Sequence, residues 1–172
     1  MANEAPSRIR IGTPNWNILI PGLRDYLVPG PAAPEDYALL ESKIEIALGL
    51  TELFWPPFVE YEEMAFRGSA EDPVDDEASK NLASWANTFN GSGSEVERMV
   101  NHEHLVDLFE QRHGEAEPDP EKLIYLGKVV RDMWAAKLKL DFPNRNFNVD
   151  LYVSEQSDIG EWLITFYQQS AA

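Results

Sequence analysis

The stretch that decides the fold is residues 147–168, which read FNVDLYVSEQSDIGEWLITFYQ. At its start Phe147, Val149 and Leu151 occupy every second position, as in a strand that buries one of its two faces. A polar loop, SEQSDIGE, follows, and residues 162–168 then form a second run rich in aromatic and β-branched side chains. The two runs predict a β-hairpin.

A helix is predicted just before this hairpin, from Asp119 to near Leu140. Asp119 is a favourable N-cap, and Pro120 suits the first turn because its missing N–H would have no partner there. Phe142-Pro143 ends the helix, since proline disfavours helical geometry in the residue before it. One apolar stripe recurs at spacings of three and four residues: Leu123, Leu126, Val130, Met133, Trp134 and Leu138.

Helical periodicity predicts three further helices, over residues 34–55, 77–89 and 94–113. In the first of them, Ile44 and Leu48 belong to a stripe that we expect to be buried. The third begins with a capping box, in which Ser94 is followed three residues later by Glu97. Together with the helix before the hairpin, these segments predict about four helices.

Residues 58–67, FVEYEEMAFR, follow a proline pair and carry aromatic and β-branched side chains that predict a strand. A lone hairpin is marginally stable in water, so this segment is expected to supply a third strand. The predicted fold class is α+β, with about four helices packed against a small, mainly antiparallel sheet that includes the C-terminal β-hairpin. We expect residues 1–13 to be flexible and residues 14–172 to form a single α+β domain.

Acidic residues are unevenly distributed along the chain, which has 30 acids, 14 bases and a formal net charge of −16. Residues 119–172 hold eight acids and six bases, a net of −2, which leaves −14 for residues 1–118. The segment from Glu52 to Glu77 contains nine acidic residues and one basic residue, Arg67. Such a charge run can simply keep a domain soluble, or it can form a face that attracts a basic partner.

The second interpretation predicts a surface that binds a basic protein partner. It comprises Trp55, Glu60, Glu62, Glu63, Glu71, Asp72, Asp75 and Asp76. Tryptophan is included because it is enriched at interface hot spots and follows the acidic run's first residue. The oligomeric state is left open by the sequence.

Composition excludes several classes of function. The sequence contains no cysteine, which rules out disulfides, thiolate metal sites and cysteine nucleophiles. It has no apolar run of the length that a secretory signal or a membrane span requires, so we expect a cytoplasmic protein that does not bind membranes. The negative charge opposes direct binding to nucleic acid, which begins with neutralisation of phosphates by Lys and Arg.

The three histidines, His102, His104 and His113, are interleaved with acids, a combination that can bind metals or transfer protons. On a regular helix, His104 and Asp107 are neighbours, whereas His102 and His104 point about 200° apart and cannot share a ligand. Neither a metalloprotease motif nor an EF-hand pattern is present. No catalytic residue, metal site or cofactor is therefore predicted.

These observations favour a non-enzymatic, acidic protein-binding domain, of the type of an immunity protein that neutralises a toxin. One alternative is an enzyme with a carboxylate–histidine site, which requires a pocket lined by His104 and Asp107. Another is a DNA mimic, which requires acids spaced like phosphates along an elongated surface. The sequence contains no motif that decides among them.

Overall fold

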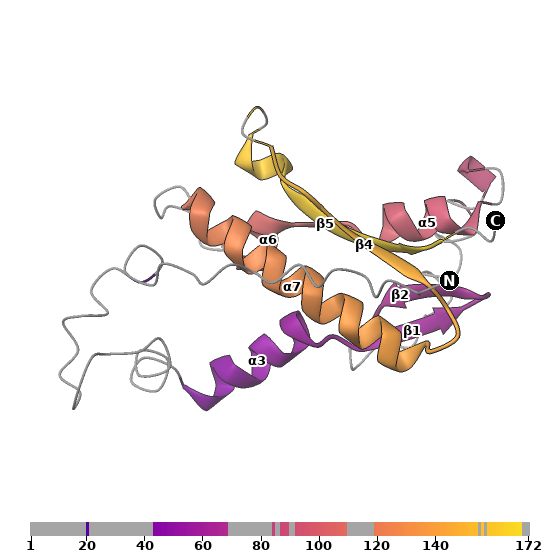
Figure 1. Ribbon diagram of the computed structural model, residues 1–172, viewed down its shortest axis with the longest axis horizontal. Helices are drawn as coiled ribbons and strands as arrows, with labels where there is room; N and C mark the ends of the chain where they lie inside the picture. The colour runs from indigo at the N-terminus through magenta and orange to yellow at the C-terminus, as the bar shows by residue number, and fades with distance from the viewer. Residues whose placement is uncertain are drawn as a thin grey trace, which may run out of the picture. The chain divides into compact units, whose positions relative to one another are not determined.

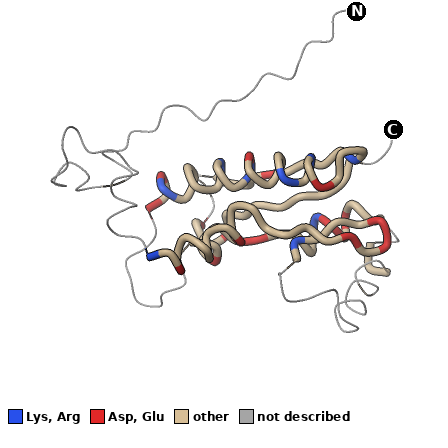
Figure 2. The backbone as a smooth tube through the Cα atoms, turned by 90° about the horizontal axis from the view of Figure 1, so that it is seen from below, with Lys and Arg blue, Asp and Glu red and all other residues tan. Residues whose placement is uncertain are grey.

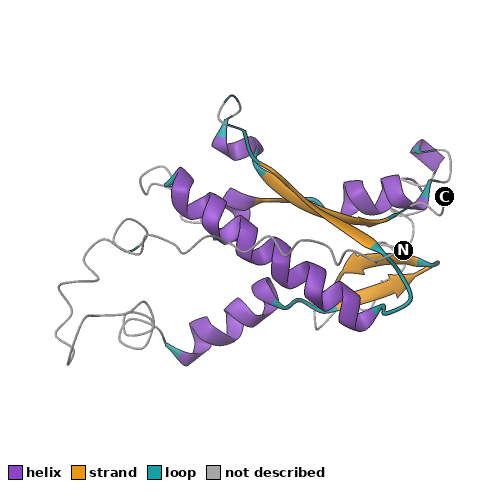
Figure 3. Ribbon diagram, viewed as in Figure 1, coloured by secondary structure: helices purple, strands orange, loops and turns teal. Residues whose placement is uncertain are grey.

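The computed structural model describes residues 20, 43–68, 84, 87–89, 92–109, 119–154, 156 and 158–169. The chain divides into two compact units, Met1–Lys43 and Ile44–Ala172, and the elements below belong to the second. They are α3 (Ile44–Phe54), β1 (Phe58–Tyr61), β2 (Met64–Arg67), α5 (Gly93–Val100), β3 (Glu103–His104), α6 (Leu105–Phe109), α7 (Pro120–Asp141), β4 (Phe147–Tyr152), the 3₁₀ helix η2 (Ile159–Glu161) and β5 (Leu163–Gln168) (Figure 1). The predicted α+β class is confirmed, because four α-helices accompany two small antiparallel sheets in the described part of the chain (Figure 3).

The predicted C-terminal hairpin is confirmed as β4 and β5. The strands pair antiparallel, from Phe147 opposite Gln168 to Tyr152 opposite Leu163. Figure 1 shows α7 running along the hairpin, and the core-facing side chains Phe147, Val149, Leu151, Ile164 and Phe166 pack in the cluster that contains the buried residues of α7. Because side chains alternate across a strand, the opposite face carries Asn148, Asp150, Tyr152, Leu163, Thr165 and Tyr167.

Helix α7 contributes the buried side of its predicted stripe to this core. Trp134 is fully buried, and its ring lies edge-on to Phe166 with the centroids 6.1 Å apart. Its indole Nε1 donates a hydrogen bond to the Leu53 carbonyl oxygen at 3.0 Å, so the polar atom is satisfied. The buried residues of α7 are Leu123, Gly127, Val130, Trp134 and Leu138. Leu126 and Met133, also in the predicted stripe, are half-buried.

Gly127 allows α7 to approach the hairpin closely. A Cβ atom at this position would lie 3.0 Å from Leu151 Cδ1 and 3.1 Å from Leu105 Cδ1. Any larger side chain here would displace both leucines, so the absence of a side chain sets the spacing between α7 and its neighbours.

The first predicted helix ends before Pro56, as expected, and the structure describes it from Ile44 onward as α3. Residues 34–42 of that prediction, and most of the helix predicted over 77–89, lie outside the described residues. The prediction that Ile44 and Leu48 are buried is wrong, because their side chains are 72% and 62% exposed. The helix makes its described contacts at its C-terminal end instead, where the Phe54 ring lies 6.3 Å from the Phe109 ring. An apolar period identifies a helical stripe, but it does not show which part of the helix has a neighbour to pack against.

The prediction that residues 58–67 form one strand is wrong. They form a tight hairpin of β1 and β2, in which Tyr61 lies opposite Met64. The two residues of the turn are Glu62 and Glu63, with φ angles of 49° and 69°. Positive φ at both turn positions is the geometry that matches the twist of a two-residue hairpin loop, and it normally selects Asn-Gly. Two glutamates carry no such signal, so the turn could not be found from the sequence.

We expect the double variant Glu62→Asn, Glu63→Gly to raise the free energy of unfolding by about 1–2 kcal/mol. The reason is that left-handed backbone costs a residue with a Cβ about 1 kcal/mol or more, and asparagine and glycine adopt it readily. Urea denaturation of the two proteins measures the difference. A variant that is no more stable than the parent would show that the turn is relaxed in solution.

Helix α5 begins at Gly93 after Ser92, and no side-chain hydrogen bond caps it, so the predicted capping box of Ser94 and Glu97 is wrong. Glu97 is instead fully buried. Its Oε1 accepts hydrogen bonds from Ala65 N and from Gln168 Nε2, both at 2.7 Å, and its Oε2 accepts one from Gln168 N at 2.6 Å. Glu97 therefore joins β2 to β5 by charge-assisted hydrogen bonds.

Asn101, one helical turn after Glu97, makes a second bridge of the same kind. Its Nδ2 donates to Ala65 O at 2.9 Å and to Phe166 O at 3.3 Å, and its Oδ1 accepts from Arg67 N at 3.1 Å. The facing edges of β2 and β5 thus bond to side chains and not to each other, which satisfies backbone groups that would otherwise be buried unpaired. The expected third strand belongs to a separate sheet for this reason.

Candidate functional site

The helix predicted over 94–113 is interrupted where His102 and His104 lie. Glu103 and His104 form strand β3, which pairs antiparallel with β5 so that Glu103 lies opposite Ile164. The helical argument that separated His102 from His104 therefore fails. Their imidazole centroids are 5.7 Å apart, with the ring planes at 85°.

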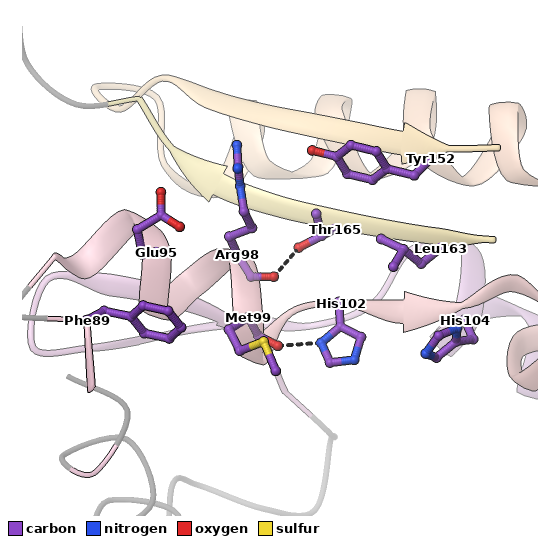
Figure 4. A pocket seen from close by; sticks show the side chains of 9 residues that line it. All are labelled: Phe89, Glu95, Arg98, Met99, His102, His104, Tyr152, Leu163 and Thr165. Carbon is purple, nitrogen blue, oxygen red and sulfur yellow. Dashed lines mark hydrogen bonds between the residues drawn. The ribbon is translucent and has the colours of Figure 1, made fainter. Parts of the chain in front are cut away.

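A cavity of about 470 Å³ lies beside these two histidines (Figure 4). Its volume falls within the range of roughly 300–1,000 Å³ that is usual for small-molecule sites. Its walls come from α5, from β3 and the residue before it, and from the face of the β4–β5 hairpin opposite α7. The lining residues are Phe89, Glu95, Arg98, Met99, His102, His104, Tyr152, Leu163 and Thr165.

The two imidazoles present different hydrogen-bonding groups. Nδ1 of His102 contacts the Met99 carbonyl oxygen, which can only accept, so Nδ1 donates this hydrogen bond and Nε2 is left for other partners. Nδ1 of His104 is buried without a partner. A buried N–H without an acceptor is costly, which favours the tautomer with the proton on Nε2.

Arg98 and two tyrosines form a network at the edge of the cavity. The Arg98 guanidinium lies over the Tyr167 ring, 4.2 Å from its centroid, and the Tyr167 hydroxyl is the main cause that raises the pKa of Arg98. The hydroxyl groups of Tyr167 and Tyr152 both donate to Oδ2 of Asp150, at 2.8 and 3.1 Å. In Figure 4 the Arg98 side chain extends across β5, and the Tyr152 hydroxyl is turned toward it.

The Tyr152 phenol should make the stability of the protein fall at alkaline pH. Partial burial, and then the hydrogen bond to Asp150, raise the pKa of Tyr152 above its ordinary value of 10.0. The contribution of this phenol to stability is complete below pH 10 and is lost as the pH rises through the raised folded-state pKa. Urea denaturation between pH 8 and 11 should therefore show that the difference in free energy of unfolding between the wild type and Tyr152→Phe shrinks as the pH rises. A pH-independent difference would contradict the assignment.

The enzyme interpretation required His104 and Asp107 to line one pocket. His104 does line the cavity, but Asp107 on α6 is not among the described residues around it. His113 lies outside the described residues. No group of three or more histidine, aspartate or glutamate side chains in the described segments is arranged to hold a metal ion.

The sequence-predicted partner surface is described only in part. Glu71, Asp72, Asp75 and Asp76 lie outside the described residues. Glu60, Glu62 and Glu63 lie together at the turn end of the β1–β2 hairpin, which Figure 2 shows as an acidic stretch. Trp55 precedes β1, at the other end of that strand. The structure therefore groups the three glutamates and separates the tryptophan from them.

The turn end of this hairpin is anchored on one side and free on the other. Arg145 Nη2 donates to Glu60 Oε1 at 2.6 Å, and Arg145 Nη1 donates to the Glu63 carbonyl oxygen at 3.1 Å. Gln168 Nε2 donates to the same carbonyl oxygen at 2.7 Å. The carboxylates of Glu62 and Glu63 are exposed and have no ion pair with any described residue. They are the available negative charges of the turn.

Trp55 is 40% exposed, and its ring lies 6.0 Å from the Lys137 ammonium group. This distance is at the limit of a cation–π contact. Lys137 also pairs with Asp141 one turn along α7. Trp55 is therefore in contact with a basic side chain of its own chain.

Helix α7 carries charges of both signs along its length (Figure 2). These residues are Glu121, Lys122, Lys128, Arg131, Asp132, Lys137, Lys139 and Asp141. A row of acids with the spacing of phosphates, as a DNA mimic requires, is not present on this helix.

The chain matches no protein-family model, no curated protein and no solved structure. In the part of the chain that the structure describes, no helix is long and apolar enough to cross a membrane.

Proposed function

We propose that this protein is a non-enzymatic binding domain that attaches a basic protein partner to the turn of its β1–β2 hairpin. The observation that supports this most directly is the pair Glu62 and Glu63, two exposed glutamates held side by side in left-handed backbone. Such a conformation is unfavourable for residues with a Cβ, and like charges at adjacent positions add repulsion. Unfavourable local arrangements of this kind cluster at binding and switch regions.

Preorganisation also supports the proposal. The Glu63 carbonyl oxygen is held by Arg145 and Gln168, so the turn is fixed to the end of β5 and to the segment before β4. A fixed backbone lowers the conformational freedom that the turn loses on binding, and the exposed carboxylates accelerate association with an oppositely charged surface. A partner with a compact cluster of lysine and arginine side chains is complementary to this turn.

A narrower form of the proposal is an immunity-type protein that neutralises a basic toxin in the cytoplasm. Its support is the physical type of the chain, which is small, free of cysteine and strongly acidic. It requires tight, salt-dependent binding to one basic protein of the same host.

The experiment is capture from the native host at low salt, with wild-type protein and the variant Glu62→Lys, Glu63→Lys as baits. We expect a basic protein that the wild type retains and the variant loses. Stopped-flow association of that protein should then be at least tenfold slower for the variant at low ionic strength, with a flatter dependence on salt.

A matched control reverses two exposed glutamates elsewhere, Glu121→Lys and Glu161→Lys, which changes the net charge by the same amount. The control should retain the partner and most of the association rate. If both double variants lose it equally, net charge and not the hairpin turn is responsible. If neither loses it, the proposed surface is wrong.

A further inference from the structure

The cavity beside α5 combines apolar walls with a few hydrogen-bond donors, most of which already have an acceptor within the protein. Met99 contributes a thioether and Leu163 an aliphatic group, while Phe89 and Tyr152 contribute aromatic rings. Flat aromatic molecules pack well against such surfaces, because rings and thioethers make favourable edge and face contacts. The walls therefore favour an aromatic ligand body.

Most donors that line the cavity are already engaged. The Thr165 hydroxyl donates to the Arg98 carbonyl oxygen at 2.7 Å, and the Tyr152 hydroxyl donates to Asp150. Nδ1 of His102 donates to the Met99 carbonyl oxygen. The Arg98 guanidinium also hydrogen-bonds to the Tyr167 side chain, so the donors that remain are its other N–H groups and the His104 ring.

Arg98 carries the one permanent positive charge of the lining. It forms no salt bridge with a described carboxylate, and its Nε is buried without a hydrogen-bond partner. Glu95 at the cavity acts on Arg98 only through a weak charge interaction, the last and smallest cause of its raised pKa. A guanidinium without a carboxylate partner can bind a ligand carboxylate by donating two parallel hydrogen bonds to it.

From this placement we infer that the cavity binds a small aromatic carboxylate. The ring lies against Met99 and Leu163, and the carboxylate accepts hydrogen bonds from Arg98. The acidity of the whole chain does not prevent this, because charges more than about 8–10 Å away are largely screened at physiological ionic strength. The local charge at the cavity decides the preference.

The test uses 2-naphthoate and its neutral analogue 2-naphthalenemethanol, titrated into the full-length protein at pH 7.5 by calorimetry. We expect 2-naphthoate to bind about tenfold more tightly or better, since hydrogen bonds to a charged group strengthen binding by at least that factor. Arg98→Gln should reduce the affinity for 2-naphthoate to that of the alcohol and leave the alcohol unaffected. Equal binding of the two probes to the wild type, or binding of neither, would overturn the inference.

Two controls separate the site from general charge and from misfolding. Lys128→Gln removes an equal charge from the exposed surface of α7 and should leave 2-naphthoate binding unchanged. Leu163→Trp fills the cavity and should abolish binding of both probes. If Leu163→Trp is unfolded by circular dichroism, the comparison of Arg98→Gln with Lys128→Gln decides alone, and equal affinities for 2-naphthoate in those two variants would contradict the assignment of Arg98.

Discussion

Replacement of Glu97 by alanine should lower the free energy of unfolding by about 3–5 kcal/mol, the range for removing one member of a buried polar network. The carboxylate is fully buried and accepts hydrogen bonds from Ala65 N, Gln168 N and Gln168 Nε2. In Glu97→Ala the buried Ala65 N–H and the part-buried Gln168 N–H lose their acceptor, while Gln168 Nε2 keeps the Glu63 carbonyl oxygen. Because they belong to both sheets, the connection between β2 and β5 is weakened as well.

Urea denaturation followed by tryptophan fluorescence measures the change. Glu95→Ala is the matched control, since Glu95 lies on the same helix but is exposed, and its removal should change the stability by no more than about 0.5 kcal/mol. Glu97→Gln should fall between the two, because an amide retains one acceptor and turns its NH₂ group toward N–H donors. A loss below 1 kcal/mol in Glu97→Ala would mean that the bridge is not formed in solution.

The second large effect is expected for Trp134→Ala, about 3–5 kcal/mol, as is usual when a buried aromatic side chain is removed. The Trp134 ring is fully buried, contacts Phe166 and Phe58 edge-on, and lies under the Arg67 guanidinium at 5.5 Å. Its removal opens a cavity between α7 and β5 and leaves the Leu53 carbonyl oxygen without its donor.

Trp134→Phe separates these two contributions. Phenylalanine keeps most of the packing but cannot donate to Leu53, so the variant should lose about 1–3 kcal/mol, and α3 should become the first element to exchange its amides. Hydrogen exchange read by NMR resolves the helices separately. Uniform exchange in α3 and α7 of this variant would show that the Leu53 contact does not hold α3 in place.

Local signals in the sequence were sufficient for the elements of the last third. The predicted N-cap is confirmed, since the Asp119 side chain accepts a hydrogen bond from Glu121 N at 3.0 Å, and α7 ends at Asp141, before Pro143. Strand β4 packs Phe147, Val149 and Leu151 against the core, as expected, and pairs with β5 over its whole length. These features depend on neighbours along the chain, so the chain order was enough to find them.

The interruption of the predicted helix 94–113 could not be found in the same way. Asn101 ends α5 while its side chain bonds to Ala65, Arg67 and Phe166, residues distant in the sequence. Those contacts compete with continued helix, and no local pattern records them. The apolar period favours a longer helix, and tertiary hydrogen bonds outweigh it.

In the candidate sites, too, local sequence patterns identify some residues, and tertiary contacts decide how they are grouped. The sequence identified the histidines and the glutamates of 60–63 as chemically distinctive, but not their neighbours. Arg98 and Tyr152 were missed, although the polar face of β4, with Asp150 and Tyr152 two residues apart, was a usable signal. The cavity arises only when α5, β3 and the outer face of the hairpin come together.

By itself, the sequence determined the α+β class, the helix and hairpin of the last third, and the concentration of acidic charge before residue 119. These follow from periodicity, caps and composition, which act over a few residues. The tertiary structure alone decided that Glu62 and Glu63 form a turn, that Glu97 connects two sheets, and that His102 and His104 share a cavity. Each of these depends on the energy of contacts between segments far apart in the chain, and no local pattern encodes that energy.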